Sequence, residues 1–431
     1  MTLLDDHAAP ARSARRPSLG DAVPLWAAVT LAVAVVLVES ALYFLHIRHQ
    51  TGAFGDLMGR VTNFEDLKSS GNIYTNFAIE GFTYPPGGIL LLCPIVLVPV
   101  AYVGAAWTVG ALGCLLLSFY FVDRQVLHLG DSAALLLASA LTIVSPILWS
   151  SVYDVLFWGQ VGAALTLLVV ADLLVVRGSM QGVLVGLATT LKIYPGVFIV
   201  VWLVRRQYRQ AVVAITTVAV TTAVAFVFWY DSSVSFFHNE LVGNQELAHF
   251  STYTTAQSSS GVDDIFFRPP YFLGHLSATN AMVVAVLVGL VGLVAAFGAW
   301  RRGHELTAMT LTLVVSTISS PIAWNHYFVF LPLLLFVPKE LGWRSWTTYA
   351  AYFALAVNVV PWHRWQLAGA IQILMPAGQR HLSWVAQNAT LVSMLLLIAA
   401  ATAEFWPRRS VTSPRRRRAA EHGEGEPALT R

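Results

Sequence analysis

Asp56, Lys192 and His326 are the residues whose types and positions could do chemistry in this sequence. Asp56 follows the first long apolar run by about ten residues, where a carboxylate could take the proton of a hydroxyl group as a general base. Lys192, in GLATTLKIYPG, is an ionisable residue within an apolar run, which by default suggests a functional site. His326, in SPIAWNHY, follows Pro321 and Trp324 at the mouth of another apolar run.

Each of the three residues also has a structural interpretation. Asp56 could be a solvated aspartate that caps the following helix. Lys192 could extend its ammonium group to the membrane interface, although Pro195 would break the helix there and could open a pocket. His326 could be a hydrogen-bonded residue at the end of a membrane span. Spacing alone leaves both interpretations open, so the elements that position these residues have to be considered.

The composition indicates an all-α polytopic membrane protein. Of 431 residues 56% are hydrophobic and only 11% are charged, with a mean hydropathy of +0.64, whereas soluble domains have about 25% charged residues. Apolar runs recur along the chain, most of them long enough to cross a bilayer as helices. The expected spans, about twelve, are 24–46, 100–122, 131–149, 157–176, 180–191, 195–204, 210–230, 280–300, 304–320, 324–338, 345–361 and 386–405, with the two beside Lys192 forming a broken pair.

The distribution of basic residues predicts the orientation of the chain in the membrane. Arginines are concentrated in both terminal segments and in the short loops near 124, 177, 205–209 and 301–302. The positive-inside rule places these parts in the cytoplasm and residues 47–86, 231–279 and 362–385 outside. We therefore expect a basic cytoplasmic arm at 1–23, a membrane domain at 24–405 and a disordered Arg-rich tail at 406–431, in a multi-pass protein of the plasma membrane.

The first external segment predicts a helix at the membrane surface followed by a stiff joint. Apolar residues recur with helical spacing at Leu57, Val61, Phe64 and Leu67. The polar residues between them are expected to face water; they are Arg60, Asn63, Asp66 and Lys68. In FTYPPGG, the two prolines favour extended backbone before a short apolar piece at 88–99. We interpret this joint as the wall of a cavity.

Several classes of site are not indicated by the sequence. It has no phosphate-binding glycine loop, zinc-ligand spacing or nucleophile elbow. Asp263 and Asp264 have no third ligand at suitable spacing, so we expect no metal site. The run Arg415–Arg418 is interpreted as a topology signal that contacts lipid headgroups, and no nucleic-acid partner is expected.

An ordered set of motifs resembles glycosyltransferase family 87 of the GT-C superfamily. The motifs are FTYPPGG (82–88), FWGQV (157–161), GLATTLKIYP (186–195), AQSSSG (256–261) and SPIAWNHY (320–327). The resemblance implies a GT-C fold and an inverting transferase that moves a sugar from a polyprenyl-phosphate donor to a lipid-anchored glycan on the outer face of the membrane. It implies that Asp56 is the general base and that Lys192 and His326 bind the donor phosphate. Within the motifs we expect Tyr84, Gln160, Gln257, Ser258 and Trp324 to bind substrate.

The motifs leave the sugar open. This sequence has Ala256-Gln257-Ser258 where mannosyltransferases of the family have Asn-Gln-Ser, and SPIAW where they have SPISW. The YPPGG motif resembles the arabinosyltransferase branch of the family, whereas SPIAWNHY resembles the mannosyltransferase branch. We expect mannose, with arabinofuranose as the alternative. The expected partners are a lipid-linked sugar donor, a glycolipid or glycan acceptor and membrane lipids, without a cofactor. A transporter or flippase for lipid-linked sugars would predict internal repeats, and an assembly protein would leave the three residues without a shared site.

Overall fold

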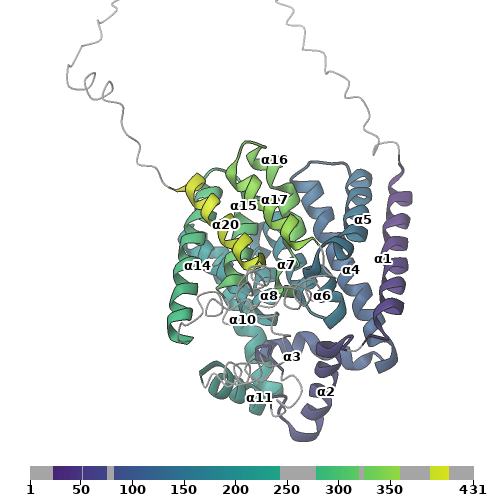
Figure 1. Ribbon diagram of the computed structural model, residues 1–431. Helices are drawn as coiled ribbons and strands as arrows, with labels where there is room; N and C mark the ends of the chain where they lie inside the picture. Colours follow the sequence, from purple (N-terminus) through teal and green to yellow (C-terminus); the bar gives the residue numbers. More distant parts are fainter. Residues whose placement is uncertain are drawn as a thin grey trace, which may run out of the picture.

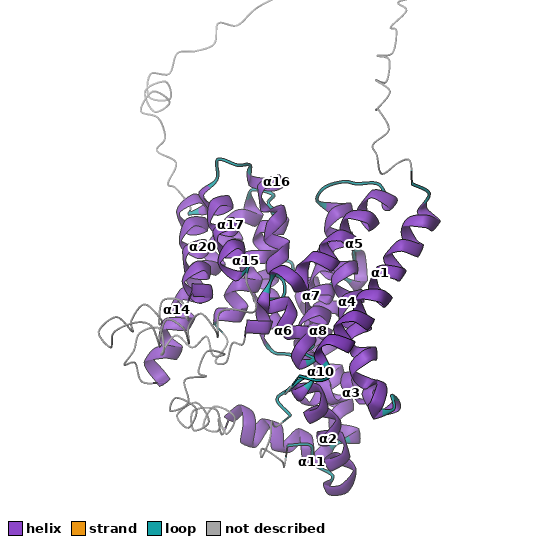
Figure 2. Ribbon diagram, turned by 45° about the vertical axis from the view of Figure 1, so that its right-hand side comes forward, coloured by secondary structure: helices purple, strands orange, loops and turns teal. Residues whose placement is uncertain are grey.

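The structure is a computed structural model that describes residues 23–50, 52–74, 82–242, 278–319, 325–359 and 389–406. Within these ranges the chain is helical, and its one β-type contact is an isolated bridge between Trp149 and Val359. Figure 2 shows this helical architecture. The predicted all-α class is confirmed for the described part. The terminal arms and the 362–385 segment lie outside it, as does most of 231–279.

Four helices are long and apolar enough to cross a membrane. They are α1 (Leu25–Ile47), α4 (Val100–Gln125), α5 (Asp131–Leu148) and α10 (Tyr208–Phe228). Each coincides with a predicted span, because a continuous Leu/Val/Ala run both favours a helix and removes its surface from water. The protein therefore crosses the membrane several times, but the predicted number of about twelve spans is not confirmed.

Two predicted spans are interrupted. The span predicted at 157–176 starts at a bend: α6 (Ser150–Trp158) ends at its first residues, and α7 (Gly162–Leu174), which covers most of it, is turned by 117° from α6. Gly159 ends α6 in the left-handed conformation, which glycine adopts without steric cost. The 324–338 segment is also no single helix. It consists of η6 (Asn325–Phe328), η7 (Leu331–Phe336) and the start of α16 (Val337–Leu341), because Pro332 and Pro338 cannot continue a regular helix.

The broken pair predicted on either side of Lys192 is present. It consists of α8 (Val183–Leu191) and α9 (Val197–Val204), joined through the turn η4 (Tyr194–Gly196). At 1.5 Å per residue each helix is only about 13 Å long, less than half of a hydrocarbon core of ~30 Å. Lys192 therefore lies at the tip of a hairpin that is too short to cross the membrane.

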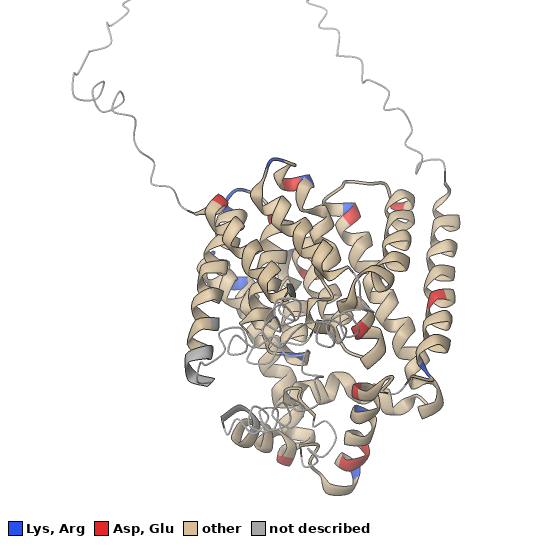
Figure 3. Cartoon of the chain, viewed as in Figure 1, with Lys and Arg blue, Asp and Glu red and all other residues tan. Residues whose placement is uncertain are grey.

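Helix ends gather at two opposite faces of the molecule. The chain enters α1 and leaves α20 (Ala389–Phe405) at the upper end of Figure 1, whereas α2 (Gly55–Ser70), α3 (Pro86–Leu92) and α11 (Tyr230–Ser235) lie at the lower end. Figure 3 shows that charged residues are concentrated towards the upper end and on α2, with few between them. This arrangement is consistent with a membrane protein in which the start of α1 and the end of α20 lie on the same side of the membrane.

Carboxylates from neighbouring helices cap three helix starts. Asp172 of α7 accepts the backbone N–H groups of Gly182 and Val185 at the start of α8, at 2.8 and 2.7 Å. Glu340 accepts two N–H groups at the start of α15 (Glu305–Ile318). Glu404 of α20 accepts one at the start of α17 (Trp346–Asn358). These contacts satisfy N–H groups that the helices leave unpaired and place negative charge at the positive end of each helix dipole.

Candidate functional site

Arg60 of α2 is buried in the protein. Together with Asn63 it was predicted to face water, and that prediction is wrong, because only 4% of each residue is exposed. The Arg60 guanidinium donates a hydrogen bond to the carbonyl oxygen of Gly159 at 2.6 Å. Its burial is offset by this bond and by the faces of Tyr84 and Trp107, 5.0 and 5.9 Å from its central carbon. Helix α2 is thus packed into the protein rather than resting on its surface.

Tyr84 lies close to two cations. The Arg60 guanidinium is 5.0 Å from the centre of its ring and the Lys192 ammonium is 5.4 Å from it. The Tyr84 hydroxyl lies 3.4 Å from the side-chain oxygen of Gln160, a long hydrogen bond. We call the buried polar group made by Arg60, Tyr84, Gln160, Lys192, His326 and Tyr327 the Tyr84 cluster. It brings four of the residues predicted from sequence together.

Lys192 belongs to this cluster and does not extend to the membrane interface. The residue is 8% exposed, and its ammonium group donates to the Tyr327 hydroxyl at 2.9 Å. Tyr194 stacks on the Tyr327 ring with centroids 5.3 Å apart. Extended backbone at Lys192 ends α8 before Pro195, so the side chain leaves the helix at its tip. The structure therefore favours a site role for Lys192 over the interfacial interpretation.

His326 is held in the cluster by its own turn. The imidazole is 4% exposed, and it lies close enough to the positive charges of Lys192 and Arg60 to interact with both electrostatically. The neighbouring Asn325 donates to the Asp154 carboxylate at 2.6 Å, which ties this turn to α6. A Cβ atom at Gly162 would lie 3.1 Å from the His326 carbonyl oxygen, so glycine allows the turn to approach the start of α7. The imidazole is therefore enclosed by protein and is not a side chain on the outer surface of the molecule.

The FTYPPGG joint packs α3 against α8 and α10. Pro86 is the first residue of α3, a position that needs no N–H donor. A Cβ atom at Gly87 would lie 2.5 Å from the Thr190 side chain, and one at Gly88 would lie 2.9 Å from Tyr84. The two glycines therefore let α3 press closely on α8. The short apolar piece expected at 88–99 is present as α3 and the 3₁₀ turn η2 (Cys93–Leu97).

Asp56 lies in the first turn of α2 and is partly buried. The helix-cap interpretation is wrong, because the N-cap residue is Phe54 and no side-chain cap is formed. Asp56 precedes Arg60 by four residues, so the two side chains share a face of α2. Within the described residues the Asp56 carboxylate makes no hydrogen bond. The described part of the chain also contains no group of three or more side chains that could bind a metal ion. Gln257, Ser258 and Trp324 lie outside the described residues.

Comparison with known proteins identifies the family to which this arrangement belongs. The model of glycosyltransferase family 87 matches residues 82–324, which is 243 of the 431 residues. The chain belongs to glycosyltransferase family 87. It is therefore a membrane glycosyltransferase, and the buried Tyr84 cluster, with Asp56 four residues before Arg60 on α2, is the candidate active site of a family 87 enzyme.

The similar proteins are mycobacterial. A polyprenol-phosphate-mannose-dependent α-(1-2)-phosphatidylinositol mannoside mannosyltransferase of Mycobacterium tuberculosis (strain ATCC 25618 / H37Rv) is 26% identical over 355 residues, 77% of this chain and 79% of that protein. A corresponding phosphatidylinositol pentamannoside mannosyltransferase of Mycobacterium tuberculosis (strain CDC 1551 / Oshkosh) is 23% identical over 423 residues, 89% of this chain and 93% of that protein. One from Mycolicibacterium smegmatis is 26% identical over 335 residues, 71% of this chain and 76% of that protein. No solved structure matches the chain significantly.

Arg60 and Tyr327 are the members of the family 87 site that the sequence interpretation missed. A usable signal existed for Arg60, which stands three residues after Leu57 and four before Phe64 and so lies within the apolar stripe of α2. A charged residue at such a position is expected to be buried with partners. Tyr327 follows His326 directly, and the sequence contains no other feature that would have predicted its place in the site.

Gly159→Ala is expected to damage the site of the transferase by displacing α2. The residue has a φ of +71°, and a Cβ atom would lie 2.5 Å from that of Leu57. Gly178→Ala is the matched control, since Gly178 has a φ of +69° but nothing within 4 Å. Backbone strain costs both variants roughly 1–2 kcal/mol, and the clash should add about 1–3 kcal/mol at Gly159 alone. Thermal unfolding in detergent measures the difference; equal midpoints would contradict the packing described here.

Proposed function

We propose that this family 87 enzyme transfers mannose from a polyprenyl-phosphate donor to a lipid-anchored mannoside on the outer face of the plasma membrane, with inversion at the anomeric carbon. The observation that carries the proposal is the pair of buried cations in one cluster, the Arg60 guanidinium and the Lys192 ammonium, which lie 5.0 and 5.4 Å from the centre of the Tyr84 ring. Positive charges gathered in a site with little water attract an anion strongly. A phosphate group is such an anion.

A phosphate in this position matches the chemistry of a lipid-phosphate donor. The developing negative charge on the leaving phosphate would be stabilised by the Arg60 guanidinium and the Lys192 ammonium in surroundings from which water is largely excluded. Arginine offers a planar fork that can bind two phosphate oxygens, and lysine a point charge. Gln160 and Tyr84 would then orient the sugar through their amide and hydroxyl groups.

Asp56 is the proposed general base. The acceptor hydroxyl would attack the anomeric carbon from the face opposite the phosphate, while the bond from that carbon to the phosphate oxygen breaks. The hydroxyl proton would pass to the Asp56 carboxylate, and the polyprenyl phosphate would leave with the bonding electron pair. Attack from the opposite face inverts the anomeric configuration. Because the leaving group is already a phosphate, the proposed reaction requires no metal.

The choice of mannose rests on the relatives, whose names specify polyprenol-phosphate-mannose as donor and phosphatidylinositol mannosides as acceptors. The arabinofuranose alternative rests on the YPPGG motif. Reconstituted protein should be assayed with polyprenyl-phosphate-mannose, polyprenyl-phosphate-arabinofuranose and a nucleotide-activated mannose, each with a phosphatidylinositol mannoside acceptor. We expect transfer only from the first donor, unaffected by a chelator. Transfer from the nucleotide donor, or from none, would refute the proposal.

The proposed orientation places α2 outside the cell and the opposite helix ends in the cytoplasm. In a background in which Cys93 and Cys114 are replaced by serine, Ser70→Cys at the end of α2 should react with an impermeant thiol reagent in intact cells. Met180→Cys is the control, since Met180 is 60% exposed in the loop between α7 and α8, on the other side of the proposed membrane. It should react only after permeabilisation. The reverse pattern would place the site on the cytoplasmic side.

A further inference from the structure

Asn325 is the first residue of η6 and stands directly before His326 of the Tyr84 cluster. Its side-chain amide donates to the Asp154 carboxylate of α6 at 2.6 Å. Because an ionised carboxylate can only accept hydrogen bonds, the amide nitrogen of Asn325 must face Asp154 and the amide oxygen must point elsewhere. Asp154 thus fixes the orientation of the Asn325 amide.

The amide oxygen of Asn325 is a buried acceptor, and among the described residues it has no hydrogen-bond partner. By contrast, Gln181, in the loop between α7 and α8, uses both ends of its amide: it donates to the Asp172 carbonyl oxygen and accepts from Gln210, each at 3.3 Å. Leaving a buried acceptor unpaired is unfavourable. A hydroxyl group of a bound substrate would satisfy the Asn325 oxygen.

Asn325 lies between the proposed general base and the proposed phosphate site. Helix α6, to which its amide is bonded, packs one turn later against the start of α2: the Trp158 ring would lie 3.3 Å from a Cβ atom at Gly55, the residue before Asp56. On its other side Asn325 is joined directly to His326. The transferred sugar has to lie between the base and the phosphate, so an acceptor for one of its hydroxyl groups is expected in this interval.

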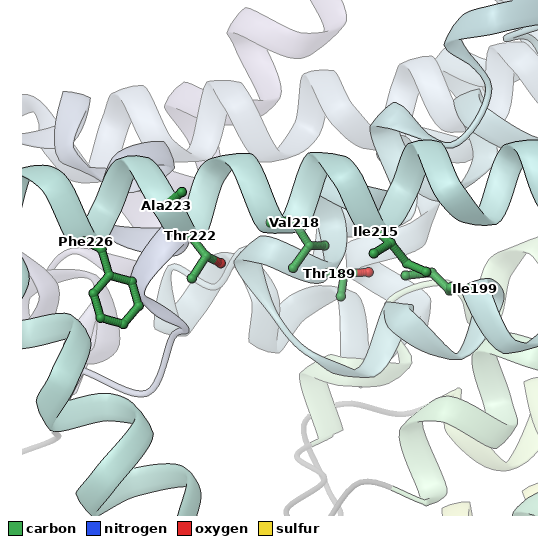
Figure 4. A pocket seen from close by; sticks show the side chains of 8 residues that line it. Thr189, Ile199, Ile215, Val218, Thr222, Ala223 and Phe226 are labelled. Atoms are coloured by element: carbon green, nitrogen blue, oxygen red, sulfur yellow. The ribbon is translucent and has the colours of Figure 1, made fainter.

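The groove between α10 and the hairpin of α8 and α9 offers a sugar no comparable group. It has a volume of about 460 Å³, and Figure 4 shows the side chains that line it. Six of its eight lining residues are apolar, and the hydroxyl of Thr189 already donates to the Val185 carbonyl oxygen at 2.8 Å. A sugar hydroxyl therefore finds a better acceptor at Asn325.

We propose that Asn325 accepts a hydrogen bond from a hydroxyl group of the transferred sugar and that Asp154 is the positioning residue that orients its amide. The inference rests on the proposed function and adds to it a residue that recognises the sugar. A site that binds one hydroxyl group discriminates against a sugar that lacks this group or holds it elsewhere. Asn325 therefore contributes to the choice between mannose and arabinofuranose.

Deoxy donors test this assignment. Wild-type protein, Asn325→Ala and Gln181→Ala are assayed with polyprenyl-phosphate-mannose and with analogues that each lack one hydroxyl group of the mannose. Wild-type protein should use one analogue on the order of tenfold less efficiently in kcat/KM, since that analogue cannot form the bond. Asn325→Ala should lose about the same factor with the parent donor and show no further loss with that analogue, because both changes remove one interaction. Gln181→Ala, the matched removal of an amide, should keep the wild-type preference.

An exchange of the two side chains separates binding from folding. Asn325→Asp alone places two carboxylates side by side and should lower kcat/KM at least as far as Asn325→Ala does. Combined with Asp154→Asn, it restores an amide-to-carboxylate bond and leaves an acceptor oxygen for the sugar. The double variant should recover most of the wild-type rate and discriminate against the same deoxy donor. It decides the question even where Asn325→Ala is unstable, since a double variant without recovery contradicts the orientation of Asn325 by Asp154.

Each outcome decides the question. The role of Asn325 is supported if one deoxy donor shows the non-additive loss and the exchange restores the preference. It is refuted if Asn325→Ala keeps the wild-type loss for every deoxy donor, as expected where a water molecule satisfies the amide oxygen, or if non-additivity appears only with deoxy acceptors. Wild-type transfer from polyprenyl-phosphate-mannose would in those cases still support the proposed function, whereas wild-type protein inactive with that donor would refute the function and the role of Asn325 in it.

Discussion

Asp56→Asn protein is expected to lose nearly all transferase activity while still binding the donor. Asparagine keeps the size and hydrogen-bonding capacity of the side chain but cannot accept the proton of the acceptor hydroxyl. General-base catalysis contributes on the order of 10²–10⁴ in rate, so kcat should fall by that factor. The measurement is single-turnover transfer from a saturating polyprenyl-phosphate-mannose donor, with donor affinity determined separately.

Two further variants make the Asp56 result specific. Asp56→Glu keeps the charge on a longer side chain and should also be slow, because a displacement of about 1 Å can cost on the order of 100-fold. Glu65→Gln removes an exposed carboxylate from the same helix and should leave kcat unchanged. An Asp56→Asn enzyme with wild-type kcat would exclude Asp56 as the base.

Lys192→Ala is expected to weaken donor binding strongly. A hydrogen bond to a charged group contributes about 1.5–3 kcal/mol, which corresponds to roughly 10- to 150-fold in donor affinity. Lys192→Arg should restore part of the loss, because it retains the charge with a different geometry. The KM for the donor, measured at saturating acceptor, reports the effect.

A structural role for Lys192 can be separated from a role in binding. Its ammonium group donates to the Tyr327 hydroxyl, so a merely structural lysine would be imitated by Tyr327→Phe, which removes that acceptor. We expect Tyr327→Phe to raise the donor KM far less than Lys192→Ala does. Similar effects of the two substitutions, together with a lower thermal stability of both, would assign Lys192 to packing.

The sequence predicted what depends on local properties of the chain. Hydropathy located α1, α4, α5 and α10 within a few residues, and Pro195 located the break between α8 and α9. The bend at Gly159 was missed because the apolar composition continues through it, although glycine at that position was its local signal.

Helical spacing gives a signal for the burial of Arg60, but it does not identify the partners of that residue. The bond from Arg60 to Gly159 joins residues 99 positions apart, and the bond from Lys192 to Tyr327 joins residues 135 positions apart. Such contacts depend on how helices pack. Motif resemblance predicted that Lys192 and His326 share a site, whereas the position of Arg60 beside the same Tyr84 ring as Lys192 required the structure.

Binding of the donor's phosphate group is the most direct test of the account. Reconstituted wild-type protein, Arg60→Gln and Lys192→Gln should each be titrated with polyprenyl phosphate and with the uncharged polyprenol of the same chain length. The account predicts that the wild-type protein binds polyprenyl phosphate at least tenfold more tightly than polyprenol, and that either substitution removes most of this preference. Equal affinity of the wild-type protein for the two lipids, or an unchanged preference in both variants, would contradict the assignment of the Tyr84 cluster as the phosphate site.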